Sequence, residues 1–144
     1  MARLKDEQKR ASIQQTAKML FAQNGFFKTS ISDIVKESGF SVGTIYNYFR
    51  SKDDLVRSIV DEGWQEFRDR MQGAVAQTDK PEEALAVVVD RFIPELLDDL
   101  ELINILLTEA VHYTDLETKI RELRDIVGGL IAAKTQRPVP GIVQ

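Results

Sequence analysis

The stretch "TSISDIVKESGFSVGTIYNYFRSKDDL", residues 29–55, decides how this chain folds. Ser30 is followed three residues later by Asp33, which is the spacing of a capping box at the start of a helix. Gly39 can end that helix in a left-handed conformation, and Ser41 can cap the next one. Two short helices joined by a tight turn predict either a helix-turn-helix, whose second helix lies in the major groove of DNA, or an ordinary helical hairpin.

Longer amphipathic helices are predicted on both sides of this stretch. Apolar residues spaced i, i+4, i+7 and i+8 from Ile13 predict a first helix over about residues 6–24, which Gly25 ends. After the stretch, Ser51 and Asp54 form another capping box, which opens a long helix.

The rest of the chain is also predicted to be helical. Pro81 suits the first turn of a helix, and Pro94 predicts a bend or a restart. Residues 100–111, "LELINILLTEAV", are apolar on nearly every side, which is typical of a central buried helix, and Asp115 or Thr114 can cap a last one. With no alternating run long enough for a strand, the predicted fold class is all-α.

Composition and charge exclude several kinds of site and show which half of the chain is suited to nucleic acid. The 144 residues are 43% hydrophobic and contain no cysteine, which excludes disulfides, thiolate zinc sites and cysteine nucleophiles. Residues 1–60 carry ten Lys/Arg against six Asp/Glu, and residues 61–144 carry nine against seventeen, so only the front half is suited to a polyanion. The start is not a signal peptide, and no apolar run reaches the roughly 20 residues of a membrane span, so we expect a soluble, cytoplasmic protein.

The residues after Thr29 resemble the DNA-binding motif of TetR-type transcriptional regulators. That motif has a short helix, a glycine, a hydroxyl-led recognition helix with a Thr-aliphatic-Tyr-x-x-Phe core, and then Ser-Lys-acid-acid-Leu. The matching residues here are Gly39, Ser41, Thr44, Ile45, Tyr46, Phe49, Ser51, Lys52, Asp53, Asp54 and Leu55. The resemblance covers roughly residues 10–60, including the helix-one ending "LFAQNGFFKTSISDI".

The resemblance implies that the chain has two domains with different functions. Residues 1–50 are expected to form a three-helix DNA-binding domain, and residues 51–144 a helical ligand-binding and dimerisation domain that begins with a connecting helix. In the family the last two long helices carry dimerisation, and no two further helices follow residues 115–133 here. We therefore expect either an abbreviated rear domain that pairs differently or a fragment.

The chemistry of the motif suggests roles in DNA binding. Side chains at the start of a recognition helix can read base edges, whereas hydroxyls and cations near helix starts bind phosphate and set the register. The predicted readout residues are Val42, Gly43, Asn47 and Tyr48. The predicted positioning residues are Thr29, Ser30, Thr44, Tyr46 and Lys52, with Ser41 as a cap that also touches DNA.

Each of these assignments has an alternative. The serines can be caps alone, Tyr46 can be core and Lys52 can be a solvated cation, whereas Ile45 and Phe49 are predicted to be core only. The N-terminal cations form either an arm along neighbouring phosphates or a disordered basic end; they are Arg3, Lys5, Lys9 and Arg10.

The rear residues are less informative. An apolar stripe can line an effector pocket or simply be core, and its members are Trp64, Phe67, Met71, Phe92, Ile103, Leu107, His112 and Tyr113. His112 follows Glu109 by three residues, half of a carboxylate–metal motif, but no second copy exists and an ordinary histidine is the better interpretation. We expect no metal, no cofactor and no enzymatic activity.

The sequence thus predicts a regulator, in the first instance a ligand-responsive repressor that binds a palindromic operator as a homodimer. Its expected partners are double-stranded DNA, a second copy of the chain and an apolar small-molecule effector, with no membrane. Two alternatives stay open: an architectural DNA binder of the same fold without an effector, and a helical module that binds other proteins.

Overall fold

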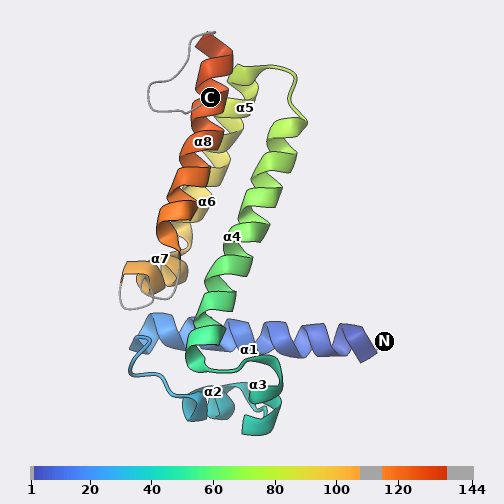
Figure 1. Cartoon of the computed structure of the whole chain (residues 1–144), viewed down its shortest axis with the longest axis vertical. Helices are drawn as coiled ribbons and strands as arrows, with labels where there is room; N and C mark the ends of the chain where they lie inside the picture. The colour runs from blue at the N-terminus through green and yellow to red at the C-terminus, as the bar shows by residue number, and fades with distance from the viewer. Residues whose placement is uncertain (1, 108–114, 136–144) are drawn as a thin grey trace. The chain divides into compact units, whose positions relative to one another are not determined.

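The structure is a computed structural model that describes residues 2–107 and 115–135, and every regular element in these ranges is a helix (Figure 1). In chain order they are α1 (Ala2–Asn24), α2 (Ile31–Ser38), α3 (Val42–Tyr48), α4 (Lys52–Ala76), α5 (Pro81–Val87), the π-helical turn η1 (Val88–Phe92), α6 (Ile93–Asp98), α7 (Leu100–Leu107) and α8 (Leu116–Thr135). The all-α prediction is confirmed.

The chain divides into two compact units. The front unit holds the residues up to Gly63 together with α7, and the rear unit holds Trp64–Asp99 together with α8. α4 is one continuous helix that begins in the front unit and ends in the rear unit. The functional division at residue 50 is not tested by these units and stays a prediction.

The front unit is organised around one apolar core to which α1, α2, α3, α4 and α7 all contribute. Burying a large aliphatic or aromatic side chain contributes about 1.5–3 kcal/mol of stability. The burial of these side chains therefore holds the short helices α2 and α3 in place. Its buried residues are Ile13, Ala17, Leu20, Phe21, Phe26, Ile34, Ile45, Phe49, Leu55, Val56, Ile59, Val60 and Ile105. Ile45 and Phe49 were predicted as core, and both are confirmed at 0% and 1% exposure.

The first helix is longer than the sequence predicts. α1 begins at Ala2 rather than near residue 6, and it ends at Asn24 before Gly25, whose φ of 89° is left-handed as expected. Arg3 and Glu7, four residues apart, form an ion pair at 3.3 Å that supports the extra turn. The basic N-terminal residues are therefore helical, so the prediction of a disordered end is wrong, whereas a contact between these residues and neighbouring phosphates stays a prediction.

The rear unit has its own core between α4, η1 and α8. Phe67, Met71, Val88 and Phe92 are buried there, and α8 packs against them through Leu123, Ile126, Val127 and Leu130. The centroids of the Phe67 and Phe92 rings lie 5.7 Å apart with nearly perpendicular planes, a favourable edge-to-face arrangement. In Figure 1, α5 and α8 run side by side, and the two helices are in contact.

Pro94 alters the helix before it. Because proline lacks an amide hydrogen, it cannot continue the regular hydrogen-bond ladder. The ladder widens at η1, where the amide of Ile93 donates to the carbonyl of Val88, five residues back, and α6 then begins with Pro94 in its first turn. The prediction was a bend or a restart, and the structure has this π-helical turn, through which the backbone of Val87, Phe92 and Ile93 stays helical. Pro81 lies in the first turn of α5 as predicted.

The prediction of a helix buried on nearly every side at residues 100–111 is wrong for its described part. α7 covers Leu100–Leu107, and residues 108–111 lie outside the described ranges. Ile105 is buried, but Leu100 is 70% exposed. α7 packs on α1, where the side-chain amide of Asn104 donates to the carbonyl of Ala22 at 3.4 Å, so one face only is covered by that contact.

α8 begins as predicted at Asp115. The Asp115 carboxylate accepts hydrogen bonds from the amide of Thr118 at 3.0 Å and from its hydroxyl at 2.6 Å, and these bonds lower the pKa of Asp115. The alternative cap, Thr114, lies outside the described ranges. Among the described helices, none is both long and apolar enough to cross a membrane.

Glu122 joins α8 to α4 within the rear unit. Its carboxylate accepts a hydrogen bond from the indole nitrogen of Trp64 at 2.7 Å and one from Arg68 at 3.0 Å. These bonds, the one from Trp64 first, lower the pKa of Glu122 below its ordinary value of 4.5. A carboxyl whose pKa is lowered on folding contributes stability above its unfolded pKa, and this is lost as pH falls through the folded pKa.

This contact predicts an acid transition that the fluorescence of Trp64, the one tryptophan in the sequence, should report. As pH falls through the lowered pKa of Glu122, the indole loses its charged partner and its emission should change. Glu122→Gln should lose this transition, whereas Glu117→Gln, on the same helix and paired with Arg121, should retain it. If the fluorescence of Trp64 changed with pH in the same way in wild type and in Glu122→Gln, the attribution of the transition to Glu122 would be contradicted.

Candidate nucleic-acid interface

The proposed recognition helix α3 is short and is fixed at both ends. Ser41 has extended backbone angles, and its hydroxyl accepts a hydrogen bond from the amide of Thr44 at 3.1 Å, which makes it the predicted N-cap. At the other end Phe49 leaves the helix in an extended conformation. Because Ile45 and Phe49 are four residues apart and buried, they fix which face of α3 points inward.

The opposite face of α3 points outward. Val42 is 52% exposed and Tyr46 is 51% exposed, one helical turn apart. Gly43 and Asn47, the next pair at the same spacing, are also exposed. The alternative that Tyr46 belongs to the core is excluded. Four residues predicted to meet DNA therefore share one accessible surface, which we call the α3 face: Val42, Gly43, Tyr46 and Asn47.

Gly43 lies in open space. A Cβ atom at this position would meet no protein atom within 4 Å, and the backbone is not left-handed. The fold does not require a glycine at this position. This is consistent with the predicted role, in which the missing side chain lets another molecule approach the backbone closely.

Thr44 and Tyr48 are half-buried, and their hydroxyls have partners within the protein. The Thr44 hydroxyl lies 2.8 Å from that of Ser41. The Tyr48 hydroxyl donates to the carboxylate of Asp6 on α1 at 3.2 Å, and partial burial together with this bond raises the pKa of Tyr48. Tyr48 therefore joins the end of α3 to α1, in addition to any contact with a base.

The structure gives Thr29 a different role from the predicted one. Its side chain is 1% exposed, and its single hydroxyl hydrogen is shared between the carbonyl of Gly25 at 2.8 Å and that of Leu20 at 3.2 Å. A hydroxyl that is buried and already bonded cannot reach a phosphate, so the predicted phosphate contact of Thr29 is wrong. The residue instead closes the turn between α1 and α2, a contact that spans nine residues and is not visible in the local motif.

Lys52 also makes contacts within the front unit. Its ammonium donates to the carbonyl of Phe26 at 2.7 Å and lies 4.3 Å from the centroid of the Phe26 ring. An ammonium carries three hydrogens, so two remain for a phosphate. Because Lys52 also anchors the start of α4 on the turn after α1, replacing it would change both stability and binding.

Ser30 forms the predicted capping box. The Asp33 amide donates to the Ser30 hydroxyl at 3.1 Å, and the Ser30 amide donates back to the Asp33 carboxylate at 2.8 Å. The hydrogen bonds that the Ser30 amide and the Ser30 hydroxyl donate to the Asp33 carboxylate, both at 2.8 Å, lower the pKa of Asp33. Ser30 is exposed, and a second role as a phosphate contact stays a prediction.

The second predicted capping box forms only in part. The Ser51 hydroxyl accepts from the amide of Asp54 at 3.0 Å, as expected, but the Asp54 carboxylate accepts from the amide of Arg50 rather than from that of Ser51. The helix start predicted at Ser51 is nevertheless confirmed, since α4 begins at Lys52.

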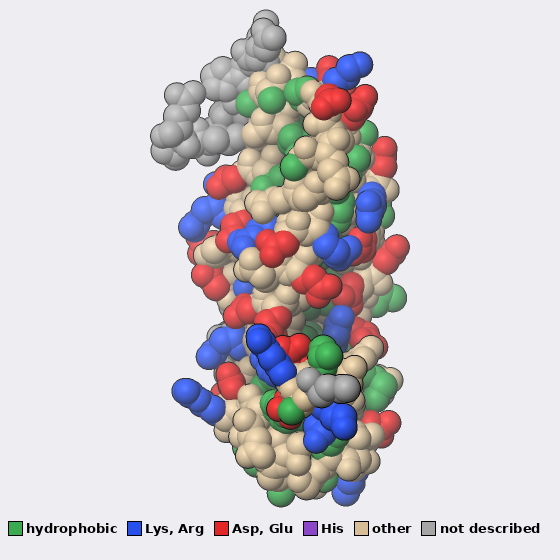
Figure 2. Space-filling model, turned by 90° about the vertical axis from the view of Figure 1, so that its right-hand side faces the viewer, with side chains coloured by type: hydrophobic (Ala, Val, Ile, Leu, Met, Phe, Trp, Pro, Cys, Tyr) green, Lys and Arg blue, Asp and Glu red, His purple; other side chains and the backbone are tan. Residues whose placement is uncertain are grey.

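Sequence reasoning missed three exposed cations in the segment between the end of α1 and the start of α4. Lys28, Lys36 and Arg50 are exposed, and none forms an ion pair with another described residue. Lys28 and Arg50 each lie one or two residues before a helix-capping serine. This position is the sequence signal from which they could have been predicted as phosphate-binding candidates. Figure 2 shows Lys and Arg side chains on the front unit, with Asp and Glu side chains among them.

The predicted effector-pocket residues lie in several places. Trp64, Phe67, Met71 and Phe92 belong to the rear core, and the Trp64 and Phe67 ring centroids are 5.7 Å apart. Ile103 lies half-buried on α7 of the front unit. The side chain of Leu107 and the residues Glu109, His112 and Tyr113 lie outside what the structure describes. The four rear residues contact one another as a core does, and the pocket stays a prediction.

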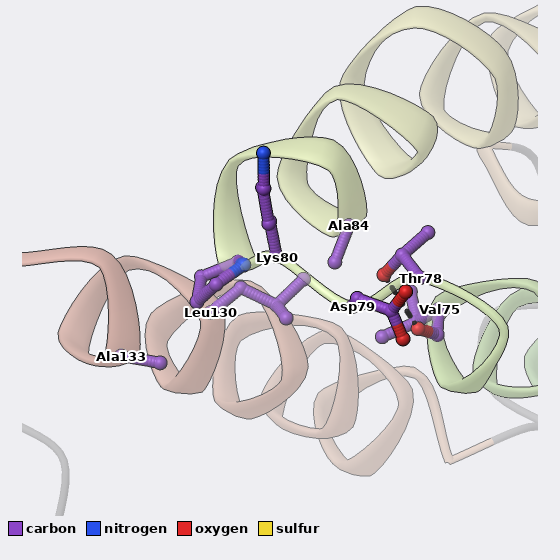
Figure 3. Close-up of a pocket in the computed structure, with 8 residues that line it drawn as sticks. Val75, Thr78, Asp79, Lys80, Ala84, Leu130 and Ala133 are labelled. Carbon is purple, nitrogen blue, oxygen red and sulfur yellow. Dashed lines mark hydrogen bonds between the residues drawn. The ribbon is translucent and has the colours of Figure 1, made fainter.

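A small hollow lies elsewhere in the rear unit. Figure 3 shows the side chains that line it, which come from the end of α4, the following loop, the start of α5 and the last part of α8. Its volume of about 190 Å³ is below the roughly 300–1,000 Å³ of a typical ligand pocket. None of the predicted pocket residues lines it; its lining is Val75, Thr78, Asp79, Lys80, Pro81, Ala84, Leu130 and Ala133.

Comparison with known proteins decides the family. Residues 13–59, which contain α2, α3 and their caps, match the model of bacterial regulatory proteins of the tetR family. The chain belongs to the TetR family. The match has nearly the same limits as the resemblance seen in residues 10–60, and it places the α3 face inside the DNA-binding part of this family.

Two curated TetR-family relatives come from Bacillus subtilis strain 168. The fatty acid metabolism regulator protein is 30% identical over 105 residues, which cover 72% of this chain and 54% of the relative. The uncharacterised HTH-type transcriptional regulator YfiR is 40% identical over 60 residues, covering 42% of this chain and 29% of the relative. The chain thus spans about half or less of the length of these relatives.

Solved structures show the same fold. The transcriptional regulator FadR from Bacillus subtilis, in complex with stearoyl-CoA, superposes with a TM-score of 0.72 at 23% identity, covering 92% of this chain and 75% of that one. The fatty acid degradation regulator FadR from Bacillus halodurans gives a TM-score of 0.68 at 26% identity, covering 89% and 66%. The TetR-family fold therefore extends beyond the matched N-terminal residues.

Proposed function

We propose that this TetR-family chain is a sequence-specific DNA-binding regulator that represses transcription and is released by a small apolar effector. The observation that carries the proposal is the α3 face. A helix capped by Ser41 and anchored by two buried side chains presents Val42, Gly43, Tyr46 and Asn47 to solvent. A recognition helix needs this combination of a fixed inner face and an accessible outer one.

The groups on the α3 face can discriminate bases. The Asn47 side-chain amide can donate to and accept from the edge of an adenine, and Val42 can pack against a thymine methyl group. Tyr46 and the hydroxyls of the capping serines can bind phosphate, which sets the register without carrying sequence information. The exposed cations Lys28, Lys36 and Arg50 supply the positive charge that a duplex backbone requires.

One recognition helix of this size contacts few bases, so we propose that two chains act together. In a dimer, two α3 helices about 34–36 Å apart would meet successive major-groove faces of a palindromic site. An effector would release DNA by binding better to the arrangement in which this spacing is wrong, since a ligand without such a preference shifts nothing. The stearoyl-CoA complex of the Bacillus subtilis regulator supports an apolar, acyl-type effector.

The test is selection of bound duplexes from a random pool, performed with the wild-type chain and with Asn47→Ala. We expect a palindromic winner for the wild type and a relaxed preference at one position of each half-site for the variant. Loss of that contact should reduce discrimination by about 1–3 kcal/mol at that position. Gln72→Ala, which removes an exposed amide from α4, is the matched control and should leave the preference unchanged.

The alternatives give different results in the same experiment. If Asn47→Ala weakened binding equally on all sequences, the architectural DNA binder would be favoured. If the wild-type chain bound no duplex even at low salt, the protein-interaction module would be favoured.

A further inference from the structure

The N-terminal half of α1 carries four cations, of which two are engaged by acids. Arg3 pairs with Glu7 on the same helix, 3.3 Å away. Arg10 pairs with Glu62 of α4 at 2.9 Å, and its guanidinium carbon lies 5.1 Å from the centroid of the Phe49 ring. These contacts are internal to the front unit and hold α1 in place.

The other two cations, Lys5 and Lys9, face solvent. Both side chains are exposed, and neither forms an ion pair or hydrogen bond with any other residue in the described ranges. Since they are four residues apart on a helix, their side chains lie one above the other along one strip. We call this strip the Lys5–Lys9 face.

The Asp6–Tyr48 bond places this strip beside the recognition helix. Asp6 adjoins Lys5 in sequence, and its carboxylate accepts the hydrogen bond from Tyr48, the last residue of α3. At about 100° per residue, Lys9 lies about 60° and Lys5 about 100° round α1 from Asp6, on the same side. In Figure 1, α1 runs past α3 and continues toward the N-terminus.

We propose that the Lys5–Lys9 face binds the phosphates of duplex DNA next to the bases that α3 reads. The proposal rests on the proposed function, and it extends the interface from α3 onto the first helix. Two lysines on a folded helix lose less conformational freedom on binding than two lysines on a disordered arm, because the backbone is already ordered. The charge of the two lysines is complementary to the phosphate backbone, and the Tyr48–Asp6 hydrogen bond joins α1 to the end of α3 next to Asn47.

The experiment measures how the binding constant depends on salt for the full chain and a Lys5→Ala/Lys9→Ala variant. Two duplexes are used with the same selected core, one extended by several base pairs on each side and one trimmed to the core. Losing two phosphate contacts should lower the slope of log K against log salt by about 1.8 on the extended duplex. On the trimmed duplex, which lacks the flanking phosphates, the two proteins should have nearly equal slopes.

The matched control is Lys80→Ala/Lys134→Ala, which removes two exposed lysines from the rear unit. It causes the same change in net charge and should leave both slopes unchanged. Thermal unfolding should be alike for all three proteins, because the four lysines are exposed and their ammonium groups make no described hydrogen bond.

The outcomes separate this inference from the proposed function. If the wild-type chain bound the core and the Lys5→Ala/Lys9→Ala variant kept the wild-type slope on the extended duplex, the inference alone would be overturned. An equal loss of slope in the control would also overturn it, since net charge would then be the cause. A wild-type chain that bound neither duplex would overturn the proposed function and the inference with it.

Discussion

Gly43→Glu should strongly weaken duplex binding while leaving the protein folded. A side chain at this position meets no protein atom within 4 Å, so the fold can accept it. A carboxylate there would project from the α3 face toward the DNA phosphates, preventing close approach of the backbone and repelling the polyanion. We expect the binding constant to fall by about 100-fold or more, equivalent to about 2.7 kcal/mol.

Stability should change little or rise in the same variant. Glycine within a helix costs about 0.8–1.0 kcal/mol relative to alanine, and glutamate is a good helix former. Gly63→Glu on α4 is the matched control, because a Cβ atom there also meets nothing within 4 Å and the charge change is identical. Titration of a labelled duplex and thermal unfolding measure the two effects. Equal loss of DNA binding in both variants would show that net charge, rather than the α3 face, is responsible.

Phe49→Ala should have the largest effect on folding. Phe49 is 1% exposed in the front core, and Arg10 stacks on its ring. Truncating a buried phenylalanine costs about 3–5 kcal/mol, a large share of the about 5–15 kcal/mol that stabilises a typical domain. The variant should lose DNA binding because α3 no longer has its inner anchor.

Tyr46→Ala provides the comparison, since Tyr46 lies on the same short helix but is 51% exposed. It should weaken binding with little change in the free energy of unfolding, which denaturant titration measures. Phe49→Leu should retain most of the apolar volume and much of the stability. If Phe49→Ala cost no more than Tyr46→Ala, the assignment of inner and outer faces of α3 would be wrong.

Much of the helical architecture follows from local sequence signals. Ser30, Ser41 and Asp115 were predicted as caps, and each makes its hydrogen bond to a residue three positions later. Gly25 and Gly39 were predicted to end helices, and both have left-handed φ angles. Such signals can be read from the sequence because the interacting groups are separated by only a few residues along the chain.

The family motif likewise located the candidate site. It gave the spacing of the two short helices and the residues of the α3 face, all within one continuous segment. The prediction from sequence is wrong for α7: its apolar run predicts burial on nearly every side, whereas Leu100 is 70% exposed. An apolar composition indicates that a helix tends to be buried. Which of its residues are buried depends on the helices that pack against it.

What the sequence alone determined, then, is the order of the helices, their caps and the outward set of residues on α3. The tertiary structure decided which polar groups remain available to DNA. Lys52 is engaged by a carbonyl 26 residues away, Tyr48 by a carboxylate 42 residues away and Arg10 by a carboxylate 52 residues away. The physical reason is that a side chain's partner depends on how the whole core packs, and packing brings together residues whose separation in sequence carries no signal.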